Sequence, residues 1–210
     1  MEIMLFGLLM ALLITPTVIT AIDRRRKLAA LQAFAFPDYL AGGARAHYPQ
    51  LSDADWAMVL QGLRDYFAIA IDAQGRRISI PSRVVDAVWH QFILSTRAYQ
   101  EFCRRVLGRF LHHTPAEAMT SPTHAQEGIR RAWRIACARE GIDPKRPDRL
   151  PRLFALDAQL AIPGGFTYVL DCRGRGAGVY CAGDIGCSGS GGWGSGGCGG
   201  DSDGGGCGGD

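Results

Sequence analysis

An uncharged apolar run near the N-terminus constrains this chain more than any other feature. Residues 3–22 read IMLFGLLMALLITPTVITAI and carry no charged side chain. At about 1.5 Å of rise per residue, a helix of this length spans about 30 Å, the thickness of the hydrocarbon core of a bilayer. A cleaved signal peptide would begin with basic residues and end at a small-x-small site, whereas this chain begins with Met1 and Glu2. We therefore expect a single transmembrane helix within residues 1–23, with a cleaved signal peptide and a buried soluble helix as the alternatives.

The charges beside this run predict its orientation. The sequence DRRRK follows it at residues 23–27, and Glu2 is the only charged residue before it. Basic residues stay on the cytoplasmic side of a membrane. We therefore expect a single-pass protein of the inner (plasma) membrane with its N-terminus outside and its body and C-terminus in the cytoplasm. Membrane lipid is therefore an expected partner through this anchor. The basic residues at 24–27 only set the topology or, as the alternative, also contact anionic lipid, with up to about 1 kcal/mol from each.

Charge in the remainder of the chain is unevenly distributed. The chain has 23 Lys and Arg against 20 Asp and Glu, but four of the acids follow Arg175, where no basic residue occurs. The other residues therefore carry 23 positive against 16 negative charges, about +7. A mildly basic body suits a membrane surface or an anionic partner, and it is too weakly basic to indicate nucleic-acid binding. We expect a protein partner of unknown identity and no nucleic acid.

Apolar periodicity and capping residues predict a helical body. Residues 52–71 begin with Ser52 and have Asp55 three positions later, which is the pattern of a capping box. The apolar residues of this segment recur at a spacing of three to four, as on one face of an amphipathic helix. Similar signals predict a helix from Arg83 and a second one from about Arg97 to Leu107, which ends at Gly108. A further helix start is predicted at Thr114, and two more helices are predicted over residues 124–140 and 150–162. Residues 39–50 are predicted to be a loop, and no long strand is indicated.

The C-terminal sequence predicts a segment that cannot fold by itself. From Gly183 onward, 15 of the 28 residues are Gly, and Ser, Asp and Cys supply most of the others. This composition buries too little apolar surface to offset the ordering of the backbone, which costs roughly 1–2 kcal/mol per residue. We expect residues 173–210 to form a disordered Gly/Ser/Cys-rich tail. Its thiols are incidental or, as the alternative, serve as soft-metal or redox groups; they are Cys181, Cys187, Cys198 and Cys207.

Residues 86–115 concentrate side chains that are able to bind a metal ion. Asp86 and His90 lie one helical turn apart, so they share a face and the carboxylate can orient the imidazole. Cys103 can approach His90 only if the chain bends near Ser95. Mixed nitrogen, sulfur and oxygen ligands favour Zn²⁺. The candidate metal ligands are His90, His113, His112, Cys103 and Asp86.

A structural interpretation of the same residues competes with the metal site. Adjacent histidines usually point in different directions, so at most one of His112 and His113 is expected to face inward. Buried polar groups normally find hydrogen-bond partners without a metal. In this alternative His90 and one of the pair are core residues, hydrogen-bonded to backbone caps, with aromatic neighbours around them: Trp89, Phe92, Tyr99 and Phe102.

This region is similar to the core of glycine-rich domain-containing proteins, a family with bacterial members and longer plant members. The resemblance covers roughly Leu51 to Cys172 and is carried by VVDAVWHQFILSTRAYQEFC, LGRFLHHTP and LPRLFALDAQLAIPGGFTYVLDC, with a Gly-rich C-terminus following. Plant members often have W-H-x-H where this chain has Trp89-His90-Gln91-Phe92, so any role of that second His is absent here. Their link to RNA does not carry over, because no aromatic-rich RNA-recognition segment is present. The resemblance implies a helical fold and a bacterial membrane-anchored member without an assigned activity.

These observations combine into a predicted organisation and function. We expect a mainly α protein with a transmembrane anchor at 1–23, a juxtamembrane helix and loop at 24–50, a small multi-helix domain at 51–172 and a tail at 173–210. No sequence motif of a hydrolase nucleophile, phosphate loop, dinucleotide site or zinc protease occurs, so the sequence does not indicate an enzyme. The expected role is a membrane-tethered helical interaction or scaffold protein. The alternatives are a Zn-type metal-binding protein that uses residues 86–113 and a thiol-redox role of the tail cysteines.

Overall fold

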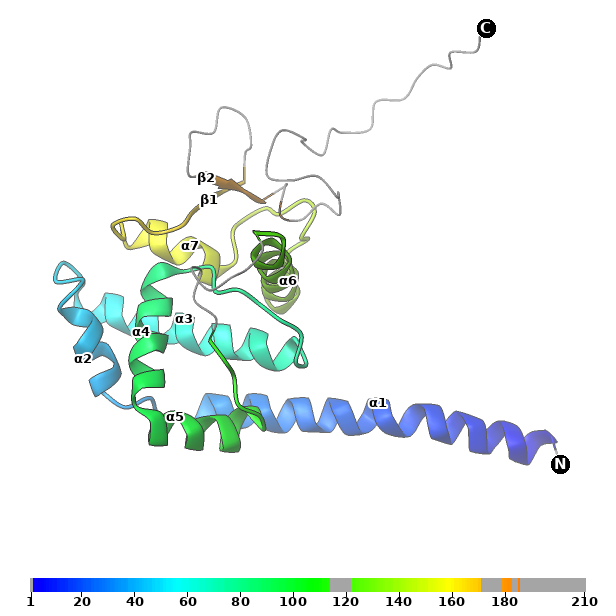
Figure 1. The fold of residues 1–210 in the computed structure, drawn as a ribbon. Helices are drawn as coiled ribbons and strands as arrows, with labels where there is room; N and C mark the ends of the chain where they lie inside the picture. The colour runs from blue at the N-terminus through cyan, green and yellow to red at the C-terminus, as the bar shows by residue number, and fades with distance from the viewer. Residues whose placement is uncertain (1, 114–121, 171–178, 183–184, 186–210) are drawn as a thin grey trace, which may run out of the picture.

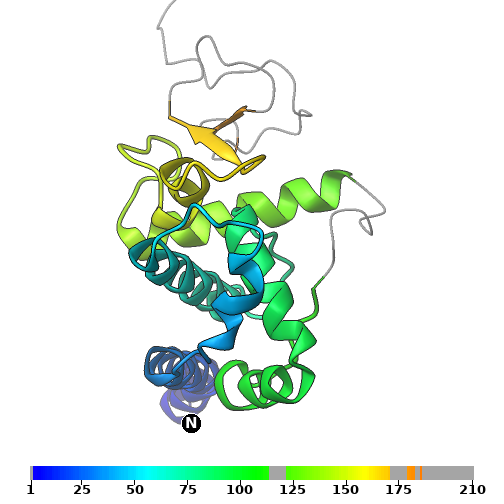
Figure 2. The same cartoon turned by 90° about the vertical axis from the view of Figure 1, so that its left-hand side faces the viewer.

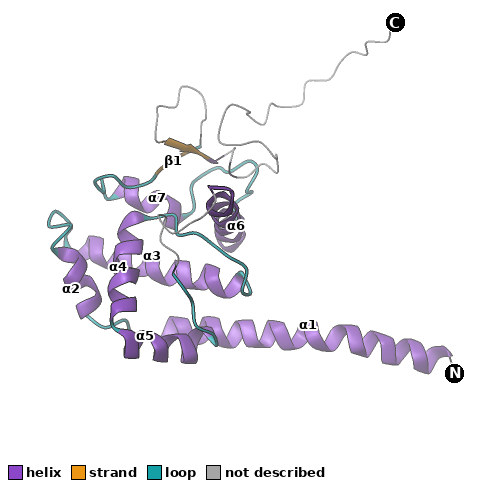
Figure 3. Cartoon of the chain, viewed as in Figure 1, coloured by secondary structure: helices purple, strands orange, loops and turns teal. Residues whose placement is uncertain are grey.

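The computed structural model describes residues 2–113, 122–170, 179–182 and 185, without the side chains of residues 2–16, 122–125 and 179. Helices dominate the described chain, as predicted (Figure 3). The elements in chain order are α1 (Glu2–Ala33), α2 (Tyr39–Arg45), α3 (Asp53–Asp72), α4 (Arg83–Leu94), α5 (Thr96–Phe102), the wider π-type turn η1 (Cys103–Leu107), α6 (Pro122–Glu140), α7 (Arg152–Gln159), β1 (Thr167–Val169) and β2 (Val179–Cys181).

The helices pack around α3, which contacts α1, α4, α6 and α7. Figure 1 shows α1 passing along one side of the body and extending well beyond it toward the N-terminus. Figures 1 and 2 both place α7 and the two short strands at the opposite end of the molecule from α1. The strands pair in parallel, with Tyr168 opposite Tyr180. The sequence analysis did not predict these two three-residue strands, which lack the length of a usual strand pattern.

Local capping fixes α3 as the sequence predicts. The backbone N–H of Asp55 donates to Ser52 Oγ at 3.3 Å, and the backbone N–H of Ser52 donates to Asp55 Oδ2 at 2.8 Å, so the capping box is confirmed. The predicted apolar face is buried at Trp56, Val59 and Phe67. Because these side chains are buried, α3 lies at the centre of the body and the other helices pack against it.

Aromatic rings from three helices and one connection meet in the core. Phe67 of α3 lies 4.6 Å from Phe102 of α5 and 6.4 Å from Phe92 of α4, measured between ring centroids. Phe34 and Phe36, just after α1, contact the same rings, with Phe34 4.9 Å from Phe102. Each such pair contributes about 0.5–1.5 kcal/mol beyond the area it buries. The cluster therefore ties the C-terminal end of α1 to the body.

Helix α2 lies where a loop was predicted. Residues 39–50 contain two glycines and one proline, which favour a loop, but residues 39–45 form a helix that packs against α4 and buries Leu40 and Ala44. A Cβ at Gly43 would stand 2.5 Å from Gln91 Oε1, so glycine permits the close approach of the two helices. Packing therefore overrides the low helix propensity of the Gly-Gly pair.

The break between α4 and α5 is confirmed, but its mechanism differs from the prediction. Ser95 has φ −81° and ψ 60°, which is outside the helical region, and its side chain does not cap α5. Instead its hydroxyl donates to the Gln91 carbonyl at 3.3 Å. Gly108 ends η1 in the left-handed conformation with φ +69°, as the sequence indicates. The chain therefore turns twice between α4 and residue 113.

A buried carboxylate joins α7 to the start of α4. Asp157, only 2 % exposed, accepts a hydrogen bond from Ser82 Oγ at 2.6 Å. It also accepts from the backbone N–H groups of Arg83 at 2.7 Å and Phe166 at 2.9 Å. Ser82 itself caps α4 by accepting from the Val85 N–H. The predicted helix start at Arg83 is therefore confirmed and is strengthened by a residue 75 positions away.

Other predictions meet the limits of the described chain. No helix in the part of the chain that the structure describes has the length and apolar content needed to cross a membrane. Residues 3–22 form much of α1, and the side chains before residue 17 lie outside the description. The predicted helix start at Thr114 and most of the predicted disordered tail at 173–210 also fall outside the described residues. The described part of that tail differs from the prediction, because Val179–Cys181 form β2 against β1 and Ile185 is buried. Helix α6 is present and ends before Gly141, which has φ +68°.

Candidate metal centre

Helix α4 presents Asp86 and His90 on its outer face. Val85, Val88, Trp89 and Phe92 point into the core, so the positions between them face away from it. The side chain of His90 is 44 % exposed and that of Asp86 is 28 % exposed. The sequence interpretation of His90 as a buried core residue is therefore wrong, because the apolar stripe of α4 directs it outward.

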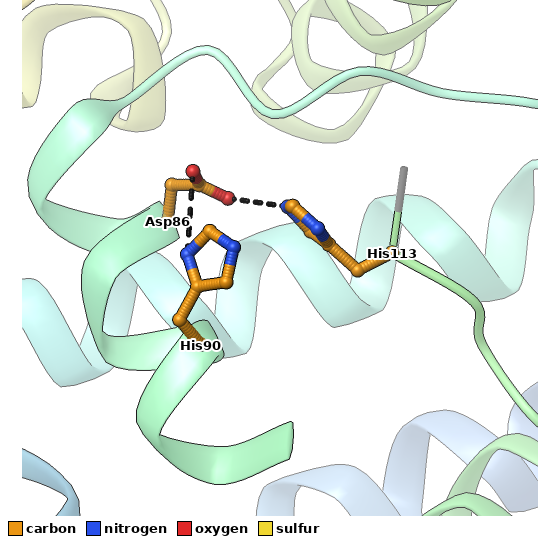
Figure 4. Close-up of side chains that lie close together, drawn as sticks. All are labelled: Asp86, His90 and His113. Carbon is orange, nitrogen blue, oxygen red and sulfur yellow. Dashed lines mark hydrogen bonds and ion pairs between the residues drawn. The ribbon is translucent and has the colours of Figure 1, made fainter. Parts of the chain in front are cut away.

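His113 completes a three-residue cluster with these two side chains. It follows η1 and reaches back to α4, where its Nε2 lies 2.9 Å from Asp86 Oδ1 (Figure 4). The other carboxylate oxygen of Asp86 lies 3.6 Å from His90 Nδ1. The two imidazole centroids are 4.2 Å apart at an interplanar angle of 65°. One potential ligand atom from each residue lies within 4.8 Å of the other two.

A buried hydrogen-bond chain positions the segment that carries His113. Trp89 Nε1 donates to the hydroxyl of Tyr99 at 3.2 Å, and that hydroxyl donates to the Leu111 carbonyl at 2.5 Å. The Trp89 ring also meets the His113 ring edge-on, with centroids 4.6 Å apart. Because Trp89 and Tyr99 are almost completely buried, they fix the backbone two residues before His113. The sequence analysis treated both aromatics as core residues and did not predict this positioning role.

Two of the five candidate ligands lie apart from the cluster. Cys103 is 1 % exposed and sits in the core, where burial raises the pKa of its thiol and disfavours the thiolate that binds metals. His112 is exposed and its ring packs on Phe110 with centroids 4.8 Å apart. The pair of histidines thus points in two directions, with His113 directed to Asp86. Among the described residues, the structure brings together Asp86, His90 and His113.

The donor atoms of the cluster are closer together than three ligands of one ion need to be in one direction and farther apart in another. Zinc bonds of about 2.0–2.2 Å at tetrahedral angles place neighbouring ligand atoms about 3.3–3.6 Å apart. His113 Nε2 lies 2.9 Å from Oδ1 of Asp86 and His90 Nδ1 lies 3.6 Å from Oδ2, so each imidazole faces a different carboxylate oxygen. His90 is exposed enough to rotate, whereas His113 is 11 % exposed and held by its neighbours. Small side-chain rotations would therefore let the three donors share one ion, with a coordination position left toward solvent.

Cysteines elsewhere bear on the redox alternative. Cys137 on α6 is buried, and burial raises its pKa to about 12, so it is an inert thiol. Cys181 of β2 is buried and disulfide-bonded. Cys187, Cys198 and Cys207 lie outside the described residues. The thiol-redox role of the tail stays a prediction.

The comparisons with known proteins identify a family and correct the resemblance described above. A family model described as UCP032817-like matches residues 26–185, which include α2 to α7 and the candidate metal centre. No curated protein and no solved structure matches the chain. The resemblance to glycine-rich domain-containing proteins is therefore wrong as a family assignment. Because the match extends over well more than half of its length, the chain belongs to the UCP032817-like family.

Proposed function

We propose that this protein binds a divalent transition-metal ion, with Zn²⁺ as the best fit, through Asp86, His90 and His113. The observation that carries the proposal is the convergence of three donor atoms within 4.8 Å from two separate segments of the chain. Two imidazole nitrogens and a carboxylate oxygen form a ligand set that zinc accepts. Three protein ligands leave a fourth position for water or a small ligand, because His90 borders solvent.

Charge also favours a cation at this place. With both imidazoles neutral, the cluster carries the single negative charge of the Asp86 carboxylate. A bound divalent ion changes this charge to +1 and gives the carboxylate a cationic partner. The competing account is a hydrogen-bonded Asp86–His113 pair that ties the segment after η1 to α4 without a metal.

Thermal unfolding with added Zn²⁺ and with a chelator separates these accounts. If the ion binds, Zn²⁺ at about 100 times its dissociation constant stabilises the fold by about 2.7 kcal/mol. For a chain of this size that raises Tm by about 5–11 °C. A wild-type protein that contains no metal by elemental analysis, and whose Tm responds to neither Zn²⁺ nor chelator, contradicts the proposal.

Matched histidine variants assign the effect to the site. His90→Ala should abolish the response to Zn²⁺ while changing the stability of the metal-free protein by less than about 1 kcal/mol, because the side chain is half-exposed. His112→Ala removes a neighbouring exposed imidazole that lies away from the cluster, so it should retain the full response. Equal loss in both variants would point to unspecific binding by surface histidines.

We also propose that the protein is attached to a membrane through its N-terminal segment, with the N-terminus outside and the body in the cytoplasm. The apolar sequence of residues 3–22 supports this, as does the exposure of Val18, Ile19 and Ile22 on α1. The test is a pair of fusions after Asp210: the fluorescent reporter should be bright and the alkaline phosphatase inactive. The opposite pattern contradicts the orientation. The role as an interaction or scaffold protein stays a prediction, because the described residues do not test it.

A further inference from the structure

A pocket of about 350 Å³ opens at the base of the projecting part of α1. Its walls come from three separate segments: α1, the C-terminal end of α3 with the turn that follows, and the end of η1. Its charged lining residues are Asp23, Arg24, Lys27 and Arg109. Three positive charges against one negative leave the lining with a charge of +2.

The pairing of these charges leaves the pocket electropositive. Arg24 donates to both carboxylate oxygens of Asp72, at 2.6 and 2.9 Å, and Arg139 donates to Asp72 at 2.8 Å. Asp72 is therefore shared between two guanidinium groups and neutralises only one of them. Lys27 lies 2.6 Å from Asp23, which is already counted in the charge of +2, and because the Asp23 side chain is 57 % exposed this pair can exchange partners at little cost in free energy.

Arg109 is the most available donor in the lining. It is exposed, and its Nη2 donates to the Ala70 carbonyl at 3.5 Å, the outer limit of a hydrogen bond. Gly108, with φ +69°, lies against Lys27, since a Cβ at that position would stand 2.8 Å from Lys27 Cε, and the next residue, Arg109, lines the same pocket as Lys27. The left-handed turn therefore places a guanidinium and an ammonium group at one opening.

The position of the pocket on α1 indicates where an anion would come from. Val18, Ile19 and Ile22 are exposed on the same helix within about two and a half turns of Lys27. Apolar side chains followed by basic residues fit the boundary between lipid tails and headgroups. Guanidinium and ammonium groups are the usual partners of phosphate oxygens.

We infer that this pocket binds a phosphate group through Lys27, Arg109 and Arg24, and that the phosphate belongs to the headgroup of an anionic membrane lipid. The inference is independent of the metal centre, because the two sites share no residue. Free inorganic phosphate has the same chemistry, so the experiment must separate the two sources.

Calorimetric titration of the full chain in mild detergent tests the inference with two probes, inorganic phosphate and a water-soluble short-chain phosphatidic acid. Lys27→Gln and Arg109→Gln should each weaken binding about tenfold, the loss expected for one charge-assisted hydrogen bond. Arg24 is left intact because its substitution would also disturb Asp72 and Arg139.

Two charge-matched controls distinguish a pocket from a generally basic surface. Arg26→Gln removes a charge from the helical position next to Lys27, outside the pocket lining. Arg104→Gln removes a charge from η1 that pairs with Glu101 instead. Both controls should bind within about twofold of wild type, because they change only long-range electrostatics.

The outcomes are decisive in each case. Tighter binding of the short-chain lipid, with weakening confined to the two pocket variants, supports the lipid headgroup. Equal affinity for both probes with the same variant pattern keeps the phosphate site and overturns the lipid as its source. No binding by the wild type, or equal weakening in pocket variants and controls, overturns the site.

Discussion

Replacing Asp157 tests how strongly α7 holds the start of α4. The carboxylate is 2 % exposed and accepts three hydrogen bonds of 2.6–2.9 Å, from Ser82, Arg83 and Phe166. A fourth donor, the Val84 N–H, lies at 3.4 Å. Asp157→Ala leaves two backbone N–H groups and one hydroxyl without their acceptor in a site with little access to water.

The expected cost follows from these contacts. Hydrogen bonds to a charged group contribute about 1.5–3 kcal/mol each, but three bonds to one carboxylate are not additive. Breaking a buried charged network typically costs about 3–5 kcal/mol, so we expect Asp157→Ala to lower the free energy of unfolding by about 4 kcal/mol. This corresponds to a fall in Tm of about 8–16 °C for a chain of this size.

The isosteric variant Asp157→Asn should cost less. The amide oxygen of Asn can take the place of Oδ2 and accept from the backbone N–H groups of Arg83 and Phe166. The NH₂ group of Asn can donate to Ser82 Oγ, whose second lone pair is not used by the hydrogen bond from the Val85 N–H. The losses are then the charge, the acceptor of the Ser82 hydroxyl hydrogen and the long Val84 contact, about 1–3 kcal/mol in total.

Urea unfolding followed by far-UV circular dichroism measures both variants, with Asp148→Ala as control. Asp148 is 74 % exposed and pairs with the adjacent Arg149 at 3.3 Å, so its loss should stay within about 0.5 kcal/mol. A cost below about 1 kcal/mol for Asp157→Ala would refute the role of this carboxylate. Equal costs for the Ala and Asn variants would show that charge, and not acceptor geometry, sets the energy.

Three further outcomes are expected from the same structure. Gly62→Val should destabilise the fold by about 2 kcal/mol in the same urea assay, because a Cβ at Gly62 would already stand 2.9 Å from Leu156 and 3.0 Å from Val85; an unchanged midpoint would mean that α3 and α4 pack less closely. The free energy of unfolding should fall as pH rises above about 9. Burial raises the folded-state pKa of Cys137 to about 12 and also raises the folded-state pKa values of Cys103, Tyr66 and Tyr99. The unfolded chain therefore loses these protons at a lower pH than the folded chain does. Cys137→Ala should flatten that slope by up to about 1.4 kcal/mol per pH unit, and an identical slope in the variant would contradict the assignment. Truncation after the buried Ile185 should leave Tm within about 2 °C of wild type, because the removed residues, 186–210, are rich in Gly and have few apolar side chains to bury. A larger fall in Tm would show that the removed residues pack on the body.

Local signals made several elements predictable. Ser52 with Asp55, Ser82 before Arg83, and the glycines at 108 and 141 act within one turn of their own position, so the sequence alone reveals them. Helix α2 and the role of Asp157 depend on residues dozens of positions away: Gln91 beside Gly43, and Ser82 beside Asp157. No window of neighbouring residues contains that information. Asp157 in particular resembles an ordinary exposed acid of an amphipathic helix.

In the candidate metal centre, too, neighbouring residues determine one part of the geometry and distant residues determine the other. Asp86 and His90 were predictable as a pair, because their spacing places them on one face of any helix. Which histidine joins them depends on the path from Ser95 to Leu111, where a helix break, a π-type turn and a left-handed glycine succeed one another. A continuous helix would carry Cys103 and both histidines away from His90 along its axis. The two turns instead reverse the chain, Tyr99 holds it at Leu111, and the next inward position is that of His113. A variant that removes the Tyr99 hydroxyl, Tyr99→Phe, should therefore weaken Zn²⁺ binding without touching a ligand. If Zn²⁺ binds the wild type and Tyr99→Phe alike, the hydrogen-bond chain through Leu111 does not position His113.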